Sequence, residues 1–338
     1  MITPKTYPIA LLLSINRKTC ESMGEIANVS GDSLLRQLDV NMPIAKKCEL
    51  LNAFFNNVTL EALIDDVTIE KEYSREIEGT SVMYNSSKGI FVRSLCSVVI
   101  MIGNGSTYVP VTHDLWINEE IMQQDYEKKH EIAKRLLESI MQHCKIRMVI
   151  ADALYATVEF MKALNELKIR FEMKMHANRV VTLESGEKIA LRDAFKGKLL
   201  RGRKWRTIRV RWRGLSLQIT AFKRYNKHGE CKIIYLVSNY NATSSAHAKA
   251  YTRRWNIEKF FRTAKQHLGL KECQSRKAAR QKNHIDNVFL AYTILHFLRK
   301  KWRLETPEAA LRRMKKRSWD YWISYLIAPN QIFATVFI

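Results

Sequence analysis

Residues 246–270 read AHAKAYTRRWNIEKFFRTAKQHLGL, the most informative stretch of this 338-residue chain. Ser244 or Ser245 can cap the start of a helix and Gly269 suits its end, so the pattern predicts one helix over 246–270. At about 100° per residue, four polar side chains of that helix fall within roughly 60° of arc. They are Tyr251, Arg254, Glu258 and Lys265.

A helix face of mixed charge is usually a solvated surface with ion pairs. Two upstream segments favour a site instead. Residues 60–71 are typical of a strand, yet Asp65 and Asp66 lie in its middle, and Asp152 ends a short apolar strand predicted over 147–151. Charges at such places are costly unless they are paired or hold a metal ion. Carboxylates on a rigid sheet and helix are the hard oxygen ligands that Mg²⁺ needs.

The spacing of the four helix residues resembles the YREK signature of DDE transposases from bacterial insertion sequences, and all four positions match. Two further blocks resemble the same family, LIDDVT at 63–68 and IADALY at 150–155. The LGL at 268–270 and a helix expected near 283–300 also fit. The resemblance extends from about residue 60 to 300, and its motifs are specific because the blocks follow the family's order.

The resemblance implies an α/β fold, namely an RNase H-like mixed sheet flanked by helices, with a β-rich insertion between the second Asp and the Glu. It also implies that two Asp and one Glu hold two Mg²⁺ ions, with Mn²⁺ as an alternative. Asp152 is then the second acid and Glu258 the third. The first catalytic acid is either Asp65 or Asp66, which lie on opposite faces of their strand; Asp65 is preferred and is the expected metal ligand.

The activity implied is cut-and-paste transposition, in which metal-dependent cleavage frees the element and strand transfer joins its 3′ ends to target DNA. Tyr251, Arg254 and Lys265 are suited to hold phosphates. The expected partners are double-stranded DNA, as terminal inverted repeats and as target, and a second copy of the chain in a synaptic homodimer. Two alternatives stay open: an RNase H-like nuclease or resolvase without strand transfer, and a catalytically inactive DNA-binding relic.

The charge of the chain also indicates a polyanionic partner. There are 56 Lys and Arg against 33 Asp and Glu, a formal net charge of +23. Residues 1–178 contain 20 basic and 23 acidic side chains, so residues 179–338 carry the whole surplus. Nucleic acid is the first class of partner that this indicates, and an acidic membrane surface the second. No segment is typical of a membrane span, and we expect a cytoplasmic, nucleoid-associated bacterial protein with no membrane partner.

Residues 179–240 form the predicted β-rich insertion, in which basic and aromatic side chains alternate along the sequence. Strand-like patterns at 207–212 and 215–222 surround a turn signal at Arg213-Gly214. We expect this segment to bind backbone phosphates, while its tryptophans either stack a displaced base or pack inside the insertion. The DNA-binding candidates are Arg203, Lys204, Trp205, Arg209, Arg211 and Trp212.

Five regions are expected along the chain. In the first, two short helices around Gly31 form either a DNA-binding helix-turn-helix or a small helical cap. In the last, a basic cluster at 312–317 precedes an apolar tail that is expected to close onto the core. The regions are 1–58 (helical, N-terminal, DNA-binding), 59–178 (first part of the catalytic core), 179–240 (basic insertion), 241–302 (catalytic helix and rest of the core) and 303–338 (basic, helical, C-terminal).

Periodicity predicts the remaining elements of the core. Strands are expected at 90–102, 107–112 and 169–175, and helices at 118–142 and 157–167. Six scattered cysteines favour neither a zinc site nor a disulfide framework.

Overall fold

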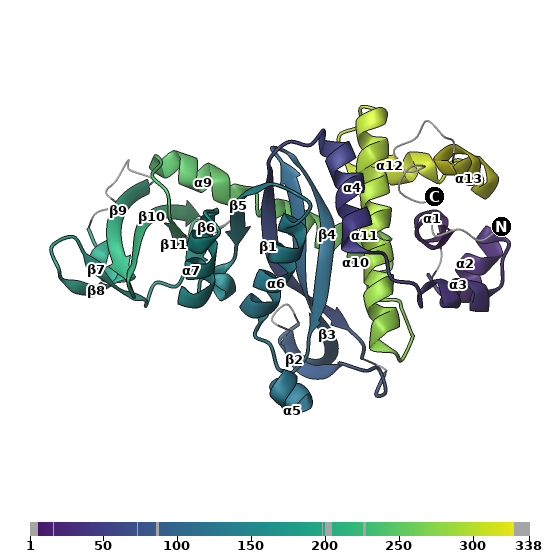
Figure 1. Ribbon diagram of the computed structural model, residues 1–338, viewed down its shortest axis with the longest axis horizontal. Helices are drawn as coiled ribbons and strands as arrows, with labels where there is room; N and C mark the ends of the chain where they lie inside the picture. The colour runs from purple at the N-terminus through teal and green to yellow at the C-terminus, as the bar shows by residue number, and fades with distance from the viewer. Residues whose placement is uncertain are drawn as a thin grey trace.

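An eleven-stranded mixed sheet runs through the computed structural model of the chain (Figure 1). The structure describes residues 6–15, 17–72, 74–85, 88–197, 199, 205–225 and 228–327. The strands follow the order β2 (Ser81–Asn85), β3 (Ile90–Asn104), β1 (Leu60–Glu70), β5 (Ile146–Ala151), β6 (Arg170–Met175), β11 (Cys231–Ser238), β10 (Leu215–Tyr225), β9 (Trp205–Trp212), β7 (Val180–Leu183) and β8 (Lys188–Ala190), and β4 (Thr107–Trp116) pairs with β3.

The central strands are built from β-branched and other apolar residues. β1 runs antiparallel to β3 and parallel to β5, and β5 runs parallel to β6. Both faces of these strands are covered, which is why β1 and β3 contain nearly continuous apolar runs rather than an apolar and polar alternation. The predicted strands at 60–71, 90–102, 107–112, 147–151 and 169–175 are confirmed to within a few residues.

The β-rich insertion continues the same sheet. Its last strand, β11, pairs antiparallel with β6, so β10, β9, β7 and β8 extend the sheet beyond the core. The β9–β10 hairpin turns at Arg213 and Gly214, which both have positive φ, 47° and 83°. Two-residue hairpin turns of this type need positive φ at both positions, and glycine adopts it without strain. The insertion is therefore rigidly connected to the core through hydrogen bonds of the sheet.

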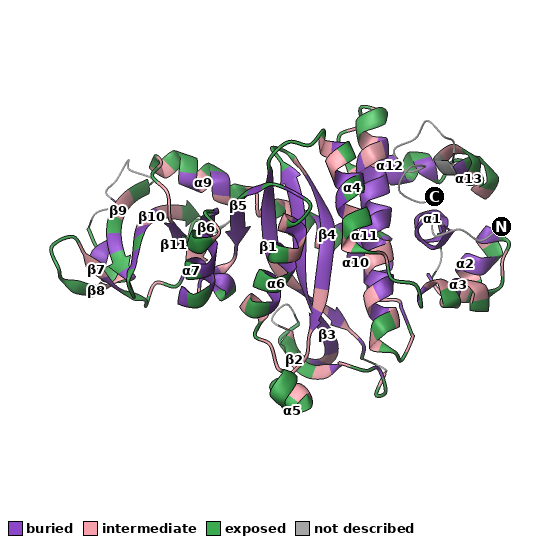
Figure 2. Ribbon diagram, viewed as in Figure 1, coloured by how far each residue is buried: buried purple, intermediate pink, exposed green. Residues whose placement is uncertain are grey.

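Helices cover both faces of the core strands. On one face, α10 (Trp255–His267) and α11 (Ala278–Lys301) pack against the side chains of Leu63 and Val99. On the other, α6 (Lys129–Met141) and α7 (Val158–Glu166) pack against the side chains of Ile64 and Ile100. Adjacent residues of a strand point to opposite faces, so each strand contributes to two separate cores. Figure 2 shows both the strands β1 and β4 and most of α11 as buried.

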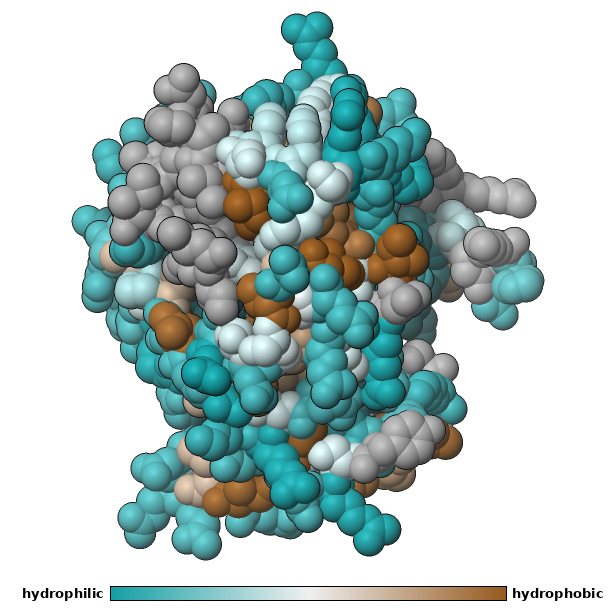
Figure 3. Space-filling model, turned by 90° about the vertical axis from the view of Figure 1, so that its right-hand side faces the viewer, coloured by the Kyte–Doolittle hydropathy of each residue, from teal (hydrophilic) through white to brown (hydrophobic). Residues whose placement is uncertain are grey.

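The two ends of the chain meet beyond α11 (Figure 1). All eight residues of α1 (Thr6–Leu13) are buried, and α1 contacts α11, α12 and α13. Figure 3 faces this end, where hydrophilic side chains predominate and hydrophobic ones lie between them. The other helices there are α2 (Cys20–Ala27), α3 (Gly31–Gln37), α12 (Pro307–Met314) and α13 (Trp319–Ile327), while α4 (Ile44–Phe55) lies beside α11.

The short helices α2 and α3 are arranged as the sequence pattern indicated. Thr19 caps α2 and Ser30 caps α3, each through a side-chain oxygen that accepts a backbone N–H bond. The predicted apolar tail, residues 321–338, begins in α13, whose Trp322 is buried in the core, and its residues after 327 lie outside the described ranges. No helix within the described ranges has the length and apolar character that a membrane crossing requires.

Two expectations about helices were wrong. Residues 118–142 form α5 (Glu119–Met122), a 3₁₀ turn η1 (Gln123–Asp125) and α6, because Gln123 takes a positive φ of 50° and interrupts the helix. Residues 246–270 form α9 (Ser244–Thr252) and α10, because the backbone tightens at Arg253 and Arg254. There the N–H groups bond three residues back rather than four, from Arg253 to Ala250 and from Arg254 to Tyr251.

Candidate active site

The register of two parallel strands brings the first and second acid segments together. In the β1–β5 pairing, Ile64 lies opposite Ala151. Asp65 follows Ile64 and Asp152 follows Ala151, so the two aspartates lie side by side where the pairing of β1 and β5 ends. Carboxyl ends of neighbouring parallel strands meet at one edge of a sheet, which is where ligands bind in open α/β folds.

Asp65 and Asp66 face opposite sides of the sheet. Asp65 points to the side covered by α10, where its Oδ2 accepts a hydrogen bond from Arg254 Nη1 at 2.7 Å. Asp66 points to the side covered by α6, where its Oδ2 pairs with Lys129 Nζ at 2.7 Å. Cys96 Sγ also lies 3.5 Å from that Asp66 oxygen. The two candidates for the first acid are thus in separate environments, and Asp65 alone faces the helix that carries Glu258.

Arg254 connects two of the carboxylates. One of its terminal nitrogens pairs with Asp65 and the other with Glu258. The Arg254 and Asp65 side chains are only 15 % and 17 % exposed, so the pair is largely shielded from water. A planar guanidinium has several fixed donors and can bind two carboxylates at once, which a lysine ammonium does less well.

Asp152 is held by a second set of contacts. The Tyr251 hydroxyl donates a hydrogen bond to Asp152 Oδ1 at 3.3 Å, and Lys174 Nζ lies 3.9 Å from the same oxygen. The guanidinium of Arg254 also lies over the Tyr251 ring, 5.7 Å from its centroid. Tyr251 and Arg254 therefore contact a group of three acids, Asp65, Asp152 and Glu258.

Burial and neighbouring charges shift the pKa values of two residues in this site. Burial raises the pKa of Asp65 to about 7, and the nearby Asp66 and Asp152 carboxylates add to the rise, while Arg254 opposes it. Burial also raises the pKa of Tyr251, so this phenol stays a hydrogen-bond donor at neutral pH. A bound cation would lower the pKa of a buried carboxyl such as that of Asp65, because an opposite charge favours the ionised form.

The tight turn between α9 and α10 is held by a buried carboxylate that the sequence reading missed. Glu61, only 1 % exposed, accepts hydrogen bonds from Tyr108, Arg147 and Arg253. Burial opposes ionisation, but these three donors hold the pKa of Glu61 below its usual value. Glu61 shares a strand face with Asp65, four residues later. A charged residue inside an apolar strand was the signal that could have identified it.

A second buried contact holds α9 against the sheet. His247 on α9 lies with its Nδ1 2.7 Å from Glu172 Oε2 on β6, and its Nε2 lies 3.0 Å from Gln218 Oε1 on β10. The Tyr240 hydroxyl donates to the same Glu172 oxygen at 2.8 Å. Both ring nitrogens of His247 have partners and the side chain is buried, so His247 is a residue of the core.

The other predicted site residues are dispersed. Lys265 lies further along α10, where burial and the charge of Lys271 lower its pKa, and it is not joined to the three acids. In β9, Trp205 is 43 % exposed whereas Trp212 is 6 % exposed and belongs to the core. Arg209 and Arg211 are exposed on the same strand, and Arg203 and Lys204 lie outside the described residues.

The donor set is chemically suited to a divalent metal ion. Three carboxylates from β1, the end of β5 and α10 supply hard oxygen ligands, and their mutual repulsion is only partly offset by Arg254. Within the described part of the chain, no three His, Cys, Asp or Glu side chains are close enough together to hold a metal as they stand. Arg254 occupies the space between two of them, and a cation would take over its role as counter-ion.

Comparison with known families gives one match. A family model described as "Transposase DDE domain" matches residues 121–294, just over half of the chain. The matched range runs from α5 to α11, so it includes Asp152, the whole insertion and Glu258, and begins after Asp65. A search of curated proteins found no match. The match confirms the resemblance to DDE transposases and, with the mixed sheet flanked by helices, the RNase H-like fold class.

Proposed function

Because this chain belongs to the transposase DDE domain family, we propose that it is the transposase of a bacterial insertion sequence, which binds the ends of its element and catalyses strand cleavage and strand transfer. The family supports a role in DNA transposition and recombination, and a nucleic-acid-processing activity. The observation that supports strand cleavage and strand transfer is the Arg254 bridge between Asp65 and Glu258, beside Asp152. Three acids from distant parts of the sequence thus lie together near the end of β5.

Asp65, Asp152 and Glu258 are the proposed metal ligands. DDE transposases generally use divalent metal ions. Mg²⁺, or Mn²⁺ in its place, would activate water or a 3′-hydroxyl for in-line attack and stabilise the leaving oxygen. Among the two adjacent aspartates, Asp65 is the proposed ligand because it faces α10, whereas Asp66 is paired with Lys129 on the opposite side.

Arg254 and Tyr251 have proposed roles that depend on whether the three carboxylates hold a cation. When the carboxylates hold a cation, the guanidinium of Arg254 is released from Asp65 and Glu258 and can bind a phosphate oxygen. Tyr251 continues to orient Asp152 through its hydroxyl. Lys265 can hold a phosphate farther along α10, where its ammonium is half-buried and interacts with Glu70 only at longer range.

The proposed partner is double-stranded DNA, both as terminal inverted repeats and as target. The exposed side chains of Trp205, Arg209 and Arg211 on β9 support this, as does the surplus of positive charge beyond residue 178. Arg203, Lys204 and the more buried Trp212 remain proposed contacts from the sequence. A homodimer is proposed because two element ends must be brought together, and the protein would then act at the nucleoid.

Replacement of Glu258 by alanine tests the proposal. The change removes one proposed ligand, so Mg²⁺-dependent nicking of a duplex carrying the element's end is expected to fall by at least about 100-fold, while binding of that duplex is retained. Glu166→Ala, which removes an exposed carboxylate from the last turn of α7, is the matched control and should cleave normally.

Three results would contradict the proposal in different ways. Wild-type nicking by the Glu258→Ala variant would exclude the carboxylate site. Nicking by the wild type without joining of 3′ ends to a target plasmid would instead indicate a nuclease or resolvase. DNA binding by the wild type without any nicking in Mg²⁺ or Mn²⁺ would indicate an inactive relic.

A further inference from the structure

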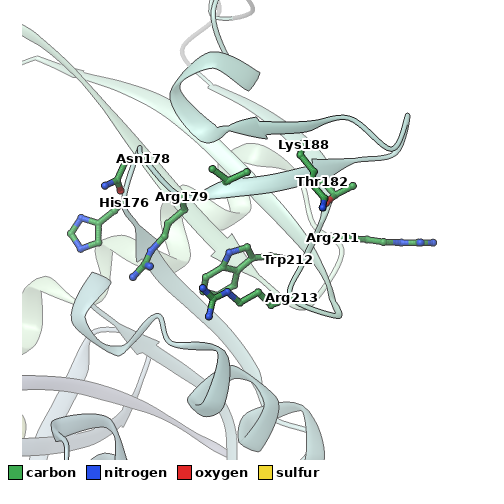
Figure 4. Close-up of a pocket in the computed structure, with 9 residues that line it drawn as sticks. His176, Asn178, Arg179, Thr182, Lys188, Arg211, Trp212 and Arg213 are labelled. Atoms are coloured by element: carbon green, nitrogen blue, oxygen red, sulfur yellow. The ribbon is translucent and has the colours of Figure 1, made fainter.

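A basic cavity opens in the insertion, away from the three acids. Its volume is about 790 Å³, and Figure 4 shows the side chains that line it. They come from three separate segments: the loop after β6, the β7–β8 hairpin, and the end of β9 with its turn. The lining residues that matter here are His176, Arg179, Lys188, Arg211, Trp212 and Arg213.

The side chains that line this cavity are rich in cations and include no acid. Four of its lining side chains are permanent cations, and no Asp or Glu lines it. Across the described ranges, none of the four takes part in an ion pair, although many other arginines and lysines of the chain do. Cations gathered without acids repel one another and attract a ligand with several negative charges. Arg179, Lys188 and Arg213 were not singled out by the sequence, because three separate segments contribute them.

Arg179 is held in place before any ligand arrives. Its guanidinium lies over the ring of Trp212, 5.8 Å from the centroid, and Trp212 itself is buried. The backbone carbonyl of Arg179 accepts a hydrogen bond from Leu191 N–H at 2.9 Å, which ties the loop to α8 (Leu191–Ala194). In Figure 4 the side chains of Arg179, Trp212 and Arg213 gather at the centre of the view, while Arg211 extends away from them. A prearranged cation loses little entropy on binding.

A short stretch of chain connects the cavity with the surroundings of one of the acids, Asp152. His176 follows the last residue of β6, and Lys174 on the same strand contacts Asp152. Five residue steps separate Lys174 from Arg179, which is at most about 18 Å of backbone. Glu159, in the first turn of α7, interacts with the charge of Arg213. Its pKa is lowered first by a hydrogen bond from its own backbone N–H and then by nearby charges, which include Arg213.

We propose that this cavity binds consecutive phosphates of a DNA backbone, with Arg179, Lys188 and Arg213 as the contacting residues and Trp212 as the support for Arg179. The choice of DNA as the ligand rests on the proposed function. Phosphate binding itself requires no catalysis, so it can be tested separately.

The test compares the full-length chain with a triple variant, Arg179→Gln, Lys188→Gln and Arg213→Gln, in binding a fluorescently labelled 30-base-pair duplex at several salt concentrations. Each lost phosphate contact reduces the slope of log affinity against log salt by about 0.9. The triple variant is therefore expected to bind at least about 10-fold more weakly and to lose between two and three from that slope.

A charge-matched control separates the cavity from net charge. The variant Lys162→Gln, Lys232→Gln and Lys249→Gln removes three exposed cations outside the cavity and should keep most of the affinity and slope. Equal loss in both variants, or wild-type binding by the first, would overturn the proposal without affecting the carboxylate site. Binding of ATP by the wild type alone, together with equal duplex binding by the wild type and the triple variant, would assign the cavity to a free nucleotide and would also overturn the proposal.

Discussion

Arg254 is the residue on which the geometry of the acids depends. It pairs with Asp65 from the sheet and with Glu258 from its own helix, so it holds two elements together through one side chain. Its neighbour Arg253 pairs with Glu61 on the same strand as Asp65. Two adjacent arginines therefore bind two carboxylates of the same strand face, and this pairing fixes how far α10 lies from β1.

The difference between Asp65 and Asp66 leads to a prediction at a single residue. Asp65→Asn should reduce Mg²⁺-dependent nicking by about 100-fold or more, because a neutral amide is a poor ligand for a divalent cation. Asp66→Asn should keep nicking within about 10-fold of the wild type, because the contacts that it alters, to Lys129 and Cys96, lie on the opposite face from the three acids. Initial rates of strand cleavage measure both.

The two variants serve as controls for each other, since they differ only in the face of β1 that is changed. Circular dichroism and thermal unfolding would establish that both are folded. The opposite order of activities, or two fully active variants, would remove Asp65 from the site.

The tight turn between α9 and α10 is the element that positions the signature residues. A straight helix over 246–270 would send Arg253 and Arg254 in directions 100° apart. In the observed turn the two side chains instead bind Glu61 and Asp65, which point to the same side of β1. Glu61 thus acts on the site through Arg253 and is a positioning residue rather than a contact to substrate.

Glu61→Gln is predicted to destabilise this element and, with it, the fold. The amide removes the charge that two arginines and Tyr108 face, and it directs an N–H₂ group at donors. We expect the free energy of unfolding to fall by about 1–3 kcal/mol, measured by urea denaturation. Glu166→Gln on the exposed end of α7 should change it by less than about 0.5 kcal/mol. An unchanged value for Glu61→Gln would show that the buried carboxylate does not hold the turn.

At the scale of the whole molecule, one long helix joins the two chain ends to the sheet. His284 on α11 lies between the Tyr7 hydroxyl of α1 and the Gly269 carbonyl, each 2.9 Å from a ring nitrogen. Burial lowers the pKa of His284 and of His296, both on α11, to about 3. Neutral His284 can donate to Gly269 and accept from Tyr7, so protonation would break a contact between three parts of the chain.

The stability of the protein is predicted to fall as the pH drops below about 6.5. The unfolded chain takes up a proton on each histidine near that pH, whereas the folded chain does not until about pH 3. Their contribution is thus fully present above pH 6.5 and is lost toward pH 3, by about 1.4 kcal/mol per pH unit for each histidine. Urea unfolding at pH 7.5, 6.5 and 5.5 measures it.

His296→Leu provides the control for this pH dependence. His296 makes no side-chain hydrogen bond to any described residue, so leucine replaces it without leaving a partner unpaired. The variant should lose the contribution of His296 to the slope between pH 6.5 and 5.5, at most about 1.4 kcal/mol per pH unit. A flat profile in the wild type, or an unchanged slope in the variant, would contradict the prediction.

The sequence alone was sufficient to predict most strands and helices and to identify the acids that could take part in a metal site. Strand patterns around Asp65, Asp66 and Asp152 and the spacing of Tyr251, Arg254 and Glu258 are local properties, and they hold whatever the neighbouring chain does. The order of helices and strands along the chain, and with it the mixed α/β class, could be predicted for the same reason. The split of the helix at Arg253 did not follow, because the partners of that turn, Glu61 and Asp65, are almost 190 residues away.

Only the tertiary structure separated Asp65 from Asp66 and assembled the basic cavity. Alternation along a strand defines two faces, but the face that meets α10 depends on how β1 pairs between β3 and β5 and on which helices cover each side. Likewise, Arg179, Lys188 and Arg213 come together only because β7 and β8 fold back beside β9. Contacts between distant segments depend on packing, and no local pattern specifies which segments will meet.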